Sequence, residues 1–282
     1  MKKLSEHRTL IFLSLSLIAF VALIIFCFKI IFTEEKIPQE ETIEEVIIKE
    51  EDGEYLSFKT LDMTYFDNSS MPYTYEDEKY KSKWIVDVSS YNKDVDFQKL
   101  KELGLEGVMI RALWRGYTEG GLYEDEMLKT HYQKALKANL EIGFYVFSKA
   151  ISKEEVKEEF DYLIELIKDY QVDLFICYDY ESAGKVDGRI YNLNRIERTD
   201  NAMYFAELCE NAGYKPMIYT NSDWAYNHYD MTKIKKYPLW YASYKDAADL
   251  PYEAIMWQYS EKMEGVRSTI IDMNMMIVKK EQ

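Results

Sequence analysis

The chain has 282 residues and a formal net charge of −15, and 48% of its residues are apolar and 15% aromatic. This length suits a single α/β barrel with an appendage, and the apolar content is enough to fill a sizeable core. The acidic balance argues against nucleic-acid binding, which needs a basic face. The three cysteines and three histidines stand far apart, so we expect no disulfide framework, no metal site and no cofactor.

An apolar stretch at residues 10–32 predicts a membrane-spanning helix, because about 20 such residues cross a bilayer. Basic residues precede the stretch and acidic residues follow it, namely Lys2, Lys3, Arg8, Glu34 and Glu35. The positive-inside rule therefore places residues 1–9 in the cytoplasm and the rest of the chain outside. A cleaved signal peptide is the alternative, but the run is longer than a typical signal core and no small-x-small pattern follows it. We expect a single-pass protein of the cell membrane with an uncleaved anchor.

Residues 33–83 predict an extracytoplasmic stalk. From Glu34 to Glu54, ten acidic residues stand against two lysines, which gives a local net charge of −8. Such a segment repels itself and stays extended. The residues after it have turn chemistry without periodicity, so we interpret them as the path to a folded domain at residues 84–282.

Strands alternate with helices through most of this domain. Buried strands are expected at residues 84–90, 107–113, 141–148, 175–182, 215–220, 238–244, 254–260 and 269–278. Amphipathic helices are expected at residues 96–103, 125–138, 153–170 and 198–211. The last three strands have little between them, which predicts a closed, mostly parallel, TIM-like α/β barrel whose last third has lost its helices. A doubly wound nucleotide-binding sheet is the alternative, but its glycine fingerprint is missing.

Four acidic residues are expected at one end of this barrel. Asp179 and Glu181 end an apolar strand and share one of its faces, roughly 6 to 7 Å apart at about 3.3 Å per residue. Burial and mutual repulsion push the pKa values of such a pair apart, so that one acid stays protonated near neutrality. Asp87 lies in the first strand and Asp272 in the last, which closure makes neighbours. The arrangement suits acid-catalysed bond cleavage, and two solvated acids at a strand end are the alternative.

Several aromatic residues near the strand ends are candidates for sugar stacking, with ordinary barrel packing as the alternative for each. They are Tyr145, Tyr219, Trp240, Tyr244 and Trp257. Gln258 is polar in an apolar strand, so we expect it to point into the barrel mouth. Arg111 is a further candidate contact. It precedes a glycine-rich loop that lacks the spacing of a phosphate-binding loop.

Eight short motifs occur in the order seen in glycoside hydrolase family 25, which the chain resembles from about Trp84 to Val278. They are Val86-Asp87-Val88-Ser89, Val108-Met109-Ile110-Arg111, Gly143-Phe144-Tyr145-Val146-Phe147, Tyr178-Asp179-Tyr180-Glu181, Ala212-Gly213-Tyr214-Lys215-Pro216, Leu239-Trp240-Tyr241-Ala242, Met256-Trp257-Gln258-Tyr259 and Ile271-Asp272-Met273-Asn274. The resemblance implies an irregular (β/α)5β3 barrel. It also implies a lysozyme (N-acetylmuramidase) that hydrolyses the β-1,4 bond from N-acetylmuramic acid to N-acetylglucosamine in peptidoglycan glycan strands.

The same resemblance implies roles for the four acids. Glu181 would be the proton donor, and Asp179 would stabilise the oxocarbenium-like centre or orient the substrate's acetamido group. Asp87 and Asp272 would hold the first two acids and the water. Retention and inversion both stay open, because the separation of the carboxylates decides between them.

The chain departs from the family after the second strand. Many members carry an acid there, whereas this chain reads Arg111-Ala112-Leu113-Trp114-Arg115-Gly116-Tyr117. Wall-binding repeats are missing as well, so the membrane span and stalk would deliver the domain to the wall. The alternative function is a catalytically silent peptidoglycan-binding module on the same barrel. A chitinase-like barrel fits the Asp-x-Glu strand end but not the flanking motifs.

Overall fold

The structure, a computed structural model, describes residues 53–182, 188–248, 252–261 and 270–281. The predicted cytoplasmic N-terminus, the predicted membrane span and residues 33–52 of the predicted stalk lie outside the described residues. Among the helices that are described, none is long and apolar enough to cross a bilayer. The chain divides into two compact units, Met1–Glu51 and Asp52–Gln282, and the second contains all the described residues.

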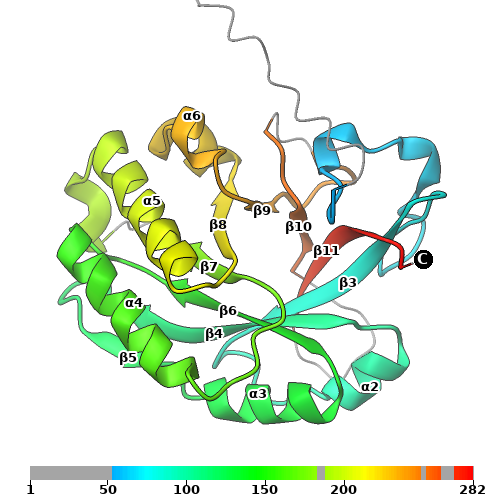
Figure 1. The fold of residues 1–282 in the computed structure, drawn as a ribbon, viewed down its shortest axis with the longest axis horizontal. Helices are drawn as coiled ribbons and strands as arrows, with labels where there is room; N and C mark the ends of the chain where they lie inside the picture. Colours follow the sequence, from blue (N-terminus) through cyan, green and yellow to red (C-terminus); the bar gives the residue numbers. More distant parts are fainter. Residues whose placement is uncertain (1–52, 183–187, 249–251, 262–269, 282) are drawn as a thin grey trace, which may run out of the picture. The chain divides into compact units, whose positions relative to one another are not determined.

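The second unit is built on a sheet that closes into a barrel (Figure 1). Its strands are β3 (Tyr80–Val88), β4 (Gly107–Arg115), β5 (Leu122–Glu124), β6 (Glu141–Phe147), β7 (Ile176–Asp179), β8 (Pro216–Asn221), β9 (Leu239–Ala242), β10 (Met256–Ser260) and β11 (Asp272–Lys279). The order in this nine-stranded sheet is β3-β11-β10-β9-β8-β7-β6-β4-β5, and β3 also pairs with β4. Strand β5 lies at the end of this order and pairs only with β4. The other eight strands form a closed ring. The predicted closed α/β barrel is confirmed.

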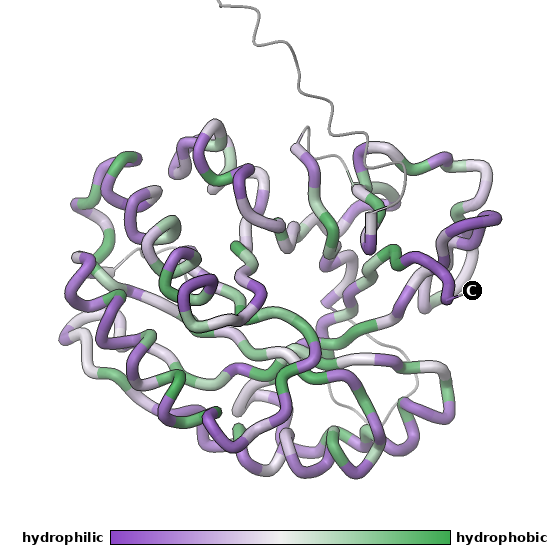
Figure 2. The backbone as a smooth tube through the Cα atoms, in the orientation of Figure 1, coloured by the Kyte–Doolittle hydropathy of each residue, from purple (hydrophilic) through white to green (hydrophobic). Residues whose placement is uncertain are grey.

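Neighbouring ring strands are parallel except around β11, which runs antiparallel to both β10 and β3. The helices that follow the first five ring strands are α2 (Phe97–Glu102), α3 (Leu128–Lys137), α4 (Lys153–Ile167), α5 (Arg195–Asn211) and α6 (Met231–Ile234). The helices carry both hydrophilic and hydrophobic residues along their length (Figure 2), because they bury one face against the barrel. The short α6 was not predicted, since four residues do not show a helical period.

Capping explains where the longer helices begin. The Ser152 side chain accepts a hydrogen bond from the backbone N–H of Glu155, which starts α4. Asn194 and Glu197 form a capping box at α5, so this helix begins at Arg195, three residues before the predicted position.

Residues 53–79, expected to belong to the stalk, pack against the barrel. They contain η1 (Phe58–Thr60), η2 (Met63–Tyr65) and the paired strands β1 (Phe66–Asp67) and β2 (Thr74–Tyr75). The backbone N–H of Leu56 donates to Ile277 O at 2.9 Å and that of Phe58 to Ala254 O at 3.0 Å. The folded domain therefore begins near residue 53 and not at Trp84. Its first part folds through irregular packing, which leaves no periodic pattern in the sequence.

Alternation along the strands fills the barrel interior and positions its polar end. The inward apolar side chains include Ile85, Met109, Phe175, Cys177, Met217, Met256 and Met276. Two residues beyond Ile85 and Cys177, on the same faces, lie Asp87 and Asp179. Both acids lie near the carboxyl ends of their strands, so the barrel places them at the same mouth.

Candidate active site

Asp179 and Glu181 lie where β7 ends. Their neighbours Tyr178 and Tyr180 take the opposite face of the strand, with ring centroids 5.4 Å apart. There Tyr178 stacks on Phe205 of α5 at 4.6 Å, and Tyr180 OH donates to Ala150 O at 2.6 Å. The two tyrosines anchor the strand end, which holds the two carboxyls toward the barrel mouth.

Asp179 is buried, and its Oδ1 has no hydrogen-bond partner among the described residues. Burial, and then the negative charge of Glu181, raise the pKa of Asp179 well above its usual range. A buried carboxyl oxygen without a partner is costly, so this atom is suited to receive a donor from a bound molecule.

Glu181 has a more polar environment. Asn221, at the end of β8, donates from Nδ2 to Glu181 Oε2 at 3.1 Å, and Lys149 Nζ donates to the backbone oxygen of Glu181. Burial is the largest influence, and it raises the pKa of Glu181 to about 7. We expected the charge of Asp179 to keep Glu181 protonated. Burial is the largest cause for both acids, and the negative charge of Glu181 adds to it for Asp179.

Asp87 and Asp272 are directly opposite each other on β3 and β11. Asp87 Oδ2 accepts hydrogen bonds from Gln258 Nε2 at 2.9 Å and from Asn274 Nδ2 at 2.8 Å. Burial raises the pKa of both acids, and burial together with the charge of Asp87 raises that of Asp272 to about 8. A protonated Asp272 can donate a hydrogen bond to Asp87, which lies opposite it.

The Asp272→Asn variant should show a different dependence of stability on pH. Native Asp272 keeps its proton up to about pH 8, whereas an unfolded Asp loses it near about pH 4. The native state thus binds the extra proton, and wild-type stability should fall between about pH 4 and 8 by an amount that the variant lacks. Thermal unfolding from about pH 4 to 9 measures this, with the exposed Asp94→Asn as control. If the melting temperatures of wild type and Asp272→Asn changed with pH in parallel, the raised pKa of Asp272 would be contradicted.

Three of the predicted aromatic residues line the barrel interior beneath the acids. The Trp240 ring lies edge-on to Tyr145 at 5.9 Å and to Tyr219 at 5.3 Å between centroids. Trp240 Nε1 donates to Asn274 Oδ1 at 2.7 Å. All three aromatic residues are nearly buried, so they form the floor of the mouth.

Tyr244 and Gln258 are linked to this floor. Gln258 points into the mouth, where its Oε1 accepts from Tyr219 OH at 3.2 Å and from Tyr244 OH at 2.9 Å. Tyr244 itself is 55% exposed and lies at the rim. It is the best placed of the predicted aromatic residues for contact with a molecule in solution.

Trp257 does not reach the mouth, which corrects its prediction as a sugar contact. It is 1% exposed, and its Nε1 donates to Ser243 O at 2.8 Å. Its ring packs against Phe58 and Tyr73 at 5.7 and 6.1 Å between centroids. The reason is alternation along β10, since Gln258 faces inward and its neighbour must face outward.

Arg111 lies on the β3 and β4 side of the mouth. Its Nε donates to Asp125 Oδ2 at 2.8 Å and its NH2 group to Ser90 Oγ at 2.9 Å. Its guanidinium carbon lies 5.3 Å from the centroid of the exposed Tyr91 ring. These contacts fix one edge of the guanidinium group and keep its charge near Asp179. This charge offsets part of the rise in the pKa of Asp179.

Arg115, the last residue of β4, stabilises the loop that follows it and that departs from the family pattern. The buried Arg115 donates from Nε to Glu159 Oε1 at 2.6 Å and from NH1 to Gly120 O at 2.8 Å. The loop carries Tyr117, whose ring centroid lies 6.2 Å from that of Phe147. Burial, and then the charges of Tyr91, Glu181 and Asp179, raise the pKa of Tyr117.

Sequence reasoning missed Lys149, Asn221, Asn274 and Tyr117 as site residues. Parity was an available signal for the first three. Lys149 lies four residues after Tyr145, Asn221 two after Tyr219 and Asn274 two after Asp272, so each has the parity of a predicted site residue. Tyr117 comes from an irregular loop, so no period marks it.

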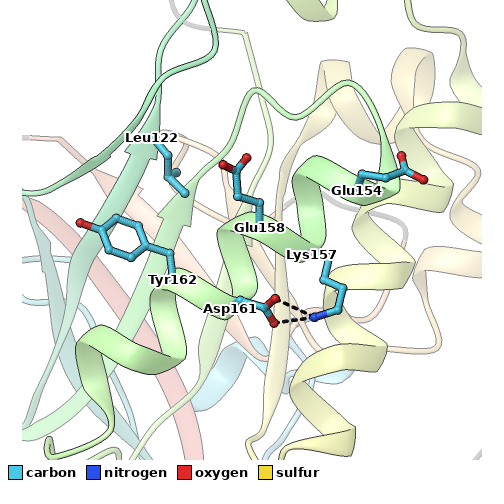
Figure 3. A pocket seen from close by; sticks show the side chains of 6 residues that line it. All are labelled: Leu122, Glu154, Lys157, Glu158, Asp161 and Tyr162. Atoms are coloured by element: carbon cyan, nitrogen blue, oxygen red, sulfur yellow. Dashed lines mark hydrogen bonds and ion pairs between the residues drawn. The ribbon is translucent and has the colours of Figure 1, made fainter.

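A second hollow lies on the outside of the domain, between α4 and β5 (Figure 3). It is lined by Leu122, Glu154, Lys157, Glu158, Asp161 and Tyr162. Lys157 and Asp161 pair with each other at 2.6 Å, and none of the four acids of the mouth contributes. In the described part of the chain, no group of three or more His, Cys, Asp or Glu side chains is arranged to hold a metal ion.

Comparison with known proteins identifies a family. The family model described as Glycosyl hydrolases family 25 matches residues 86–266. The autolytic lysozyme of Clostridium acetobutylicum is 29% identical over 185 residues, which are 64% of this chain and 52% of that protein. The chain thus spans about half the length of this relative.

Solved structures share the fold. A family 25 glycosyl hydrolase from Bacillus anthracis superimposes with a TM-score of 0.58 at 22% identity, over 74% of this chain and 94% of that one. The modular autolysin LytC from Streptococcus pneumoniae, solved in complex with a synthetic peptidoglycan ligand, gives a TM-score of 0.59 at 20% identity, over 69% of this chain and 46% of that one. At these identities the similarity establishes the fold alone.

Proposed function

The chain belongs to glycosyl hydrolases family 25, and from this premise we propose that it is a peptidoglycan hydrolase of the lysozyme type. It would cleave the β-1,4 bond between N-acetylmuramic acid and N-acetylglucosamine. The observation that carries the proposal is the partly buried Glu181, whose pKa is raised to about 7, beside Asp179 with its unpartnered Oδ1. An acid with a pKa near the working pH is what proton transfer to a leaving oxygen requires.

In this proposal Glu181 donates its proton to the glycosidic oxygen as the bond breaks. Asp179 lies next to it and would either stabilise the oxocarbenium-like centre or orient the acetamido group of the substrate. The acetamido N–H is a donor that the unpartnered Asp179 Oδ1 can accept. Asp87 would keep the site ordered through the hydrogen bonds that it accepts from Gln258 and Asn274, and Asp272 lies opposite it on β11.

The glycan strand would lie across the barrel mouth. Tyr244 is the exposed aromatic platform at its rim, and the polar side chains of Gln258 and Arg111 face the same opening. Tyr145, Tyr219 and Trp240 would support these contacts from the floor. Aromatic faces suit the apolar faces of sugar rings, and the adjacent polar groups orient the hydroxyls. Support for a peptidoglycan substrate comes from the autolytic lysozyme and from the LytC complex.

Loss of turbidity of a purified peptidoglycan suspension tests the proposal. The full-length protein should clear the suspension, because solubilisation requires cleaved bonds. A catalytically silent binding module would instead co-sediment with the peptidoglycan and leave the turbidity unchanged. That second result would refute the enzyme and support the module.

The proposal also places the enzyme in the cell membrane. Residues 10–32 would cross the bilayer once, with residues 1–9 in the cytoplasm and the barrel outside, and the acidic segment up to residue 52 would be the stalk. The protein should then sediment with membranes, and protease added to cells with a permeable wall should reach the barrel. A soluble mature protein whose N-terminus lies beyond residue 32 would contradict the anchor.

A further inference from the structure

A fully buried lysine lies at the end of β6 and is not part of the proposed mechanism. Lys149 is 0% exposed and follows Tyr145 and Phe147 at intervals of two residues, so it continues their face of the strand. Its Nζ donates to the backbone oxygen of Glu181 and lies 4.4 Å from the Phe147 ring centroid and 5.2 Å from that of Tyr117. A buried ammonium is costly unless negative groups compensate it, so its position needs a reason.

The residues on both sides of Lys149 are fixed by hydrogen bonds. Ser148 Oγ donates to Glu159 Oε2 at 2.7 Å and accepts from the backbone N–H of Ala150 at 3.0 Å. The carbonyl oxygen of Ala150 accepts from Tyr180 OH at 2.6 Å. Since Tyr180 is the residue before Glu181, the loop of Lys149 and the strand end of Glu181 are tied together at two points.

Glu181 lies among charged and titratable groups from several strand ends. They are the carboxyls of Asp179, Asp87 and Asp272, the ammonium of Lys149, and the phenols of Tyr117, Tyr219, Tyr229 and Tyr244. The guanidinium of Arg111 also acts on Asp179, but it is paired with Asp125. If Lys149 were neutral, its positive charge would no longer offset the mutual repulsion that raises the pKa values of these carboxyls.

We infer that Lys149 is a positioning residue for the acid of the proposed reaction: its ammonium holds the main chain of Glu181 and supplies the positive charge that faces the Glu181 and Asp179 carboxyls. The inference rests on the proposed function for its role in hydrolysis, but not for its effect on the two carboxyls. Lys149 lowers the pKa of both acids and is the largest charge effect on Glu181. Without it, Glu181 would keep its proton to a higher pH and release it less readily.

Replacing Lys149 by Met keeps most of the stem and removes the charge. The alkaline limb of kcat/KM for peptidoglycan hydrolysis should then move to higher pH by about one unit or more, the usual effect of removing a neighbouring opposite charge. Lys149→Arg, which retains the charge, should leave the limb close to wild type. Lys153→Met, at an exposed lysine of α4, is the control for loss of a nearby positive charge.

Titration of ¹³C-labelled glutamate side-chain carboxyls by NMR gives the same information without any turnover. The Glu181 resonance, assigned by its loss in Glu181→Gln, should titrate at higher pH in Lys149→Met than in wild type. An unchanged titration in a folded Lys149→Met protein would overturn the inference, whether or not the wild type hydrolyses peptidoglycan. A shifted titration in a protein without hydrolysis would uphold the inference and refute the proposed function. If Lys149→Met does not fold, Lys149→Gln takes its place under the same criteria.

Discussion

Glu181→Gln should lower the rate of peptidoglycan hydrolysis on the order of 10²-fold or more, because the amide keeps the shape of the side chain but has no acidic proton to give. The loss should lie in kcat, since binding depends on the surrounding mouth. The wild-type rate should fall above about pH 7, where Glu181, with its pKa raised to about 7 by burial, loses its proton. Binding of the variant to insoluble peptidoglycan should remain.

The control for this substitution is Glu126→Gln, which removes the charge of an exposed glutamate. It should keep the wild-type rate and pH profile. Sedimentation with peptidoglycan measures binding separately from turnover. A Glu181→Gln protein with near-wild-type turnover would remove Glu181 as the proton donor, and Asp179 would become the first candidate, because burial raises its pKa as well.

Asp179→Asn should also lower hydrolysis on the order of 10²-fold, a loss like that of other polar groups that stabilise a transition state. The substitution removes a carboxyl that would face the developing cation or accept from the acetamido group. Asp179→Ala should lose at least as much, because it also removes the hydrogen-bonding atoms. Rates of both variants, measured beside wild type at the same peptidoglycan concentration, test this.

The pH profile of Asp179→Asn separates two explanations of the raised Glu181 pKa. Burial is its largest cause and repulsion by Asp179 is not among its main causes, so the alkaline limb of the variant should stay near that of wild type. Mutual repulsion within the pair, which was expected from the sequence, would instead give a shift to lower pH on loss of the charged neighbour. A limb that moves down by about one unit would restore that explanation, since a nearby like charge has effects of this size.

The barrel and the convergence of its acids could be predicted because both depend on simple periods. Alternation places Asp87, Asp179 and Asp272 on inward faces, and closure of the barrel makes the first and last strands neighbours. The same rule, applied to β10, would have moved Trp257 to the outside, because Gln258 and Trp257 cannot both face the mouth. The error came from treating aromatic residues by type instead of by parity.

Other features have no local signal. Residues 53–79 pack through rings such as Phe58 and Tyr73 against Trp257, which lies far away in the sequence. The buried charge of Lys149 is understandable only beside Glu181 and Asp179, which lie thirty or more residues further along the chain. The division of pKa shifts within the acid pair also depends on burial, which the spacing of two carboxyls along a strand does not define.

We propose that this barrel cleaves peptidoglycan as a muramidase, and the reducing end of its products tests this most directly. Purified peptidoglycan is digested with the full-length protein, the products are reduced with borohydride, and the terminal sugar alcohol is identified by mass spectrometry, with Glu181→Gln as the negative control. We predict reduced N-acetylmuramic acid at the new ends, formed by the wild type and nearly absent with the variant. Reduced N-acetylglucosamine, or released peptides without new sugar ends, would contradict the account.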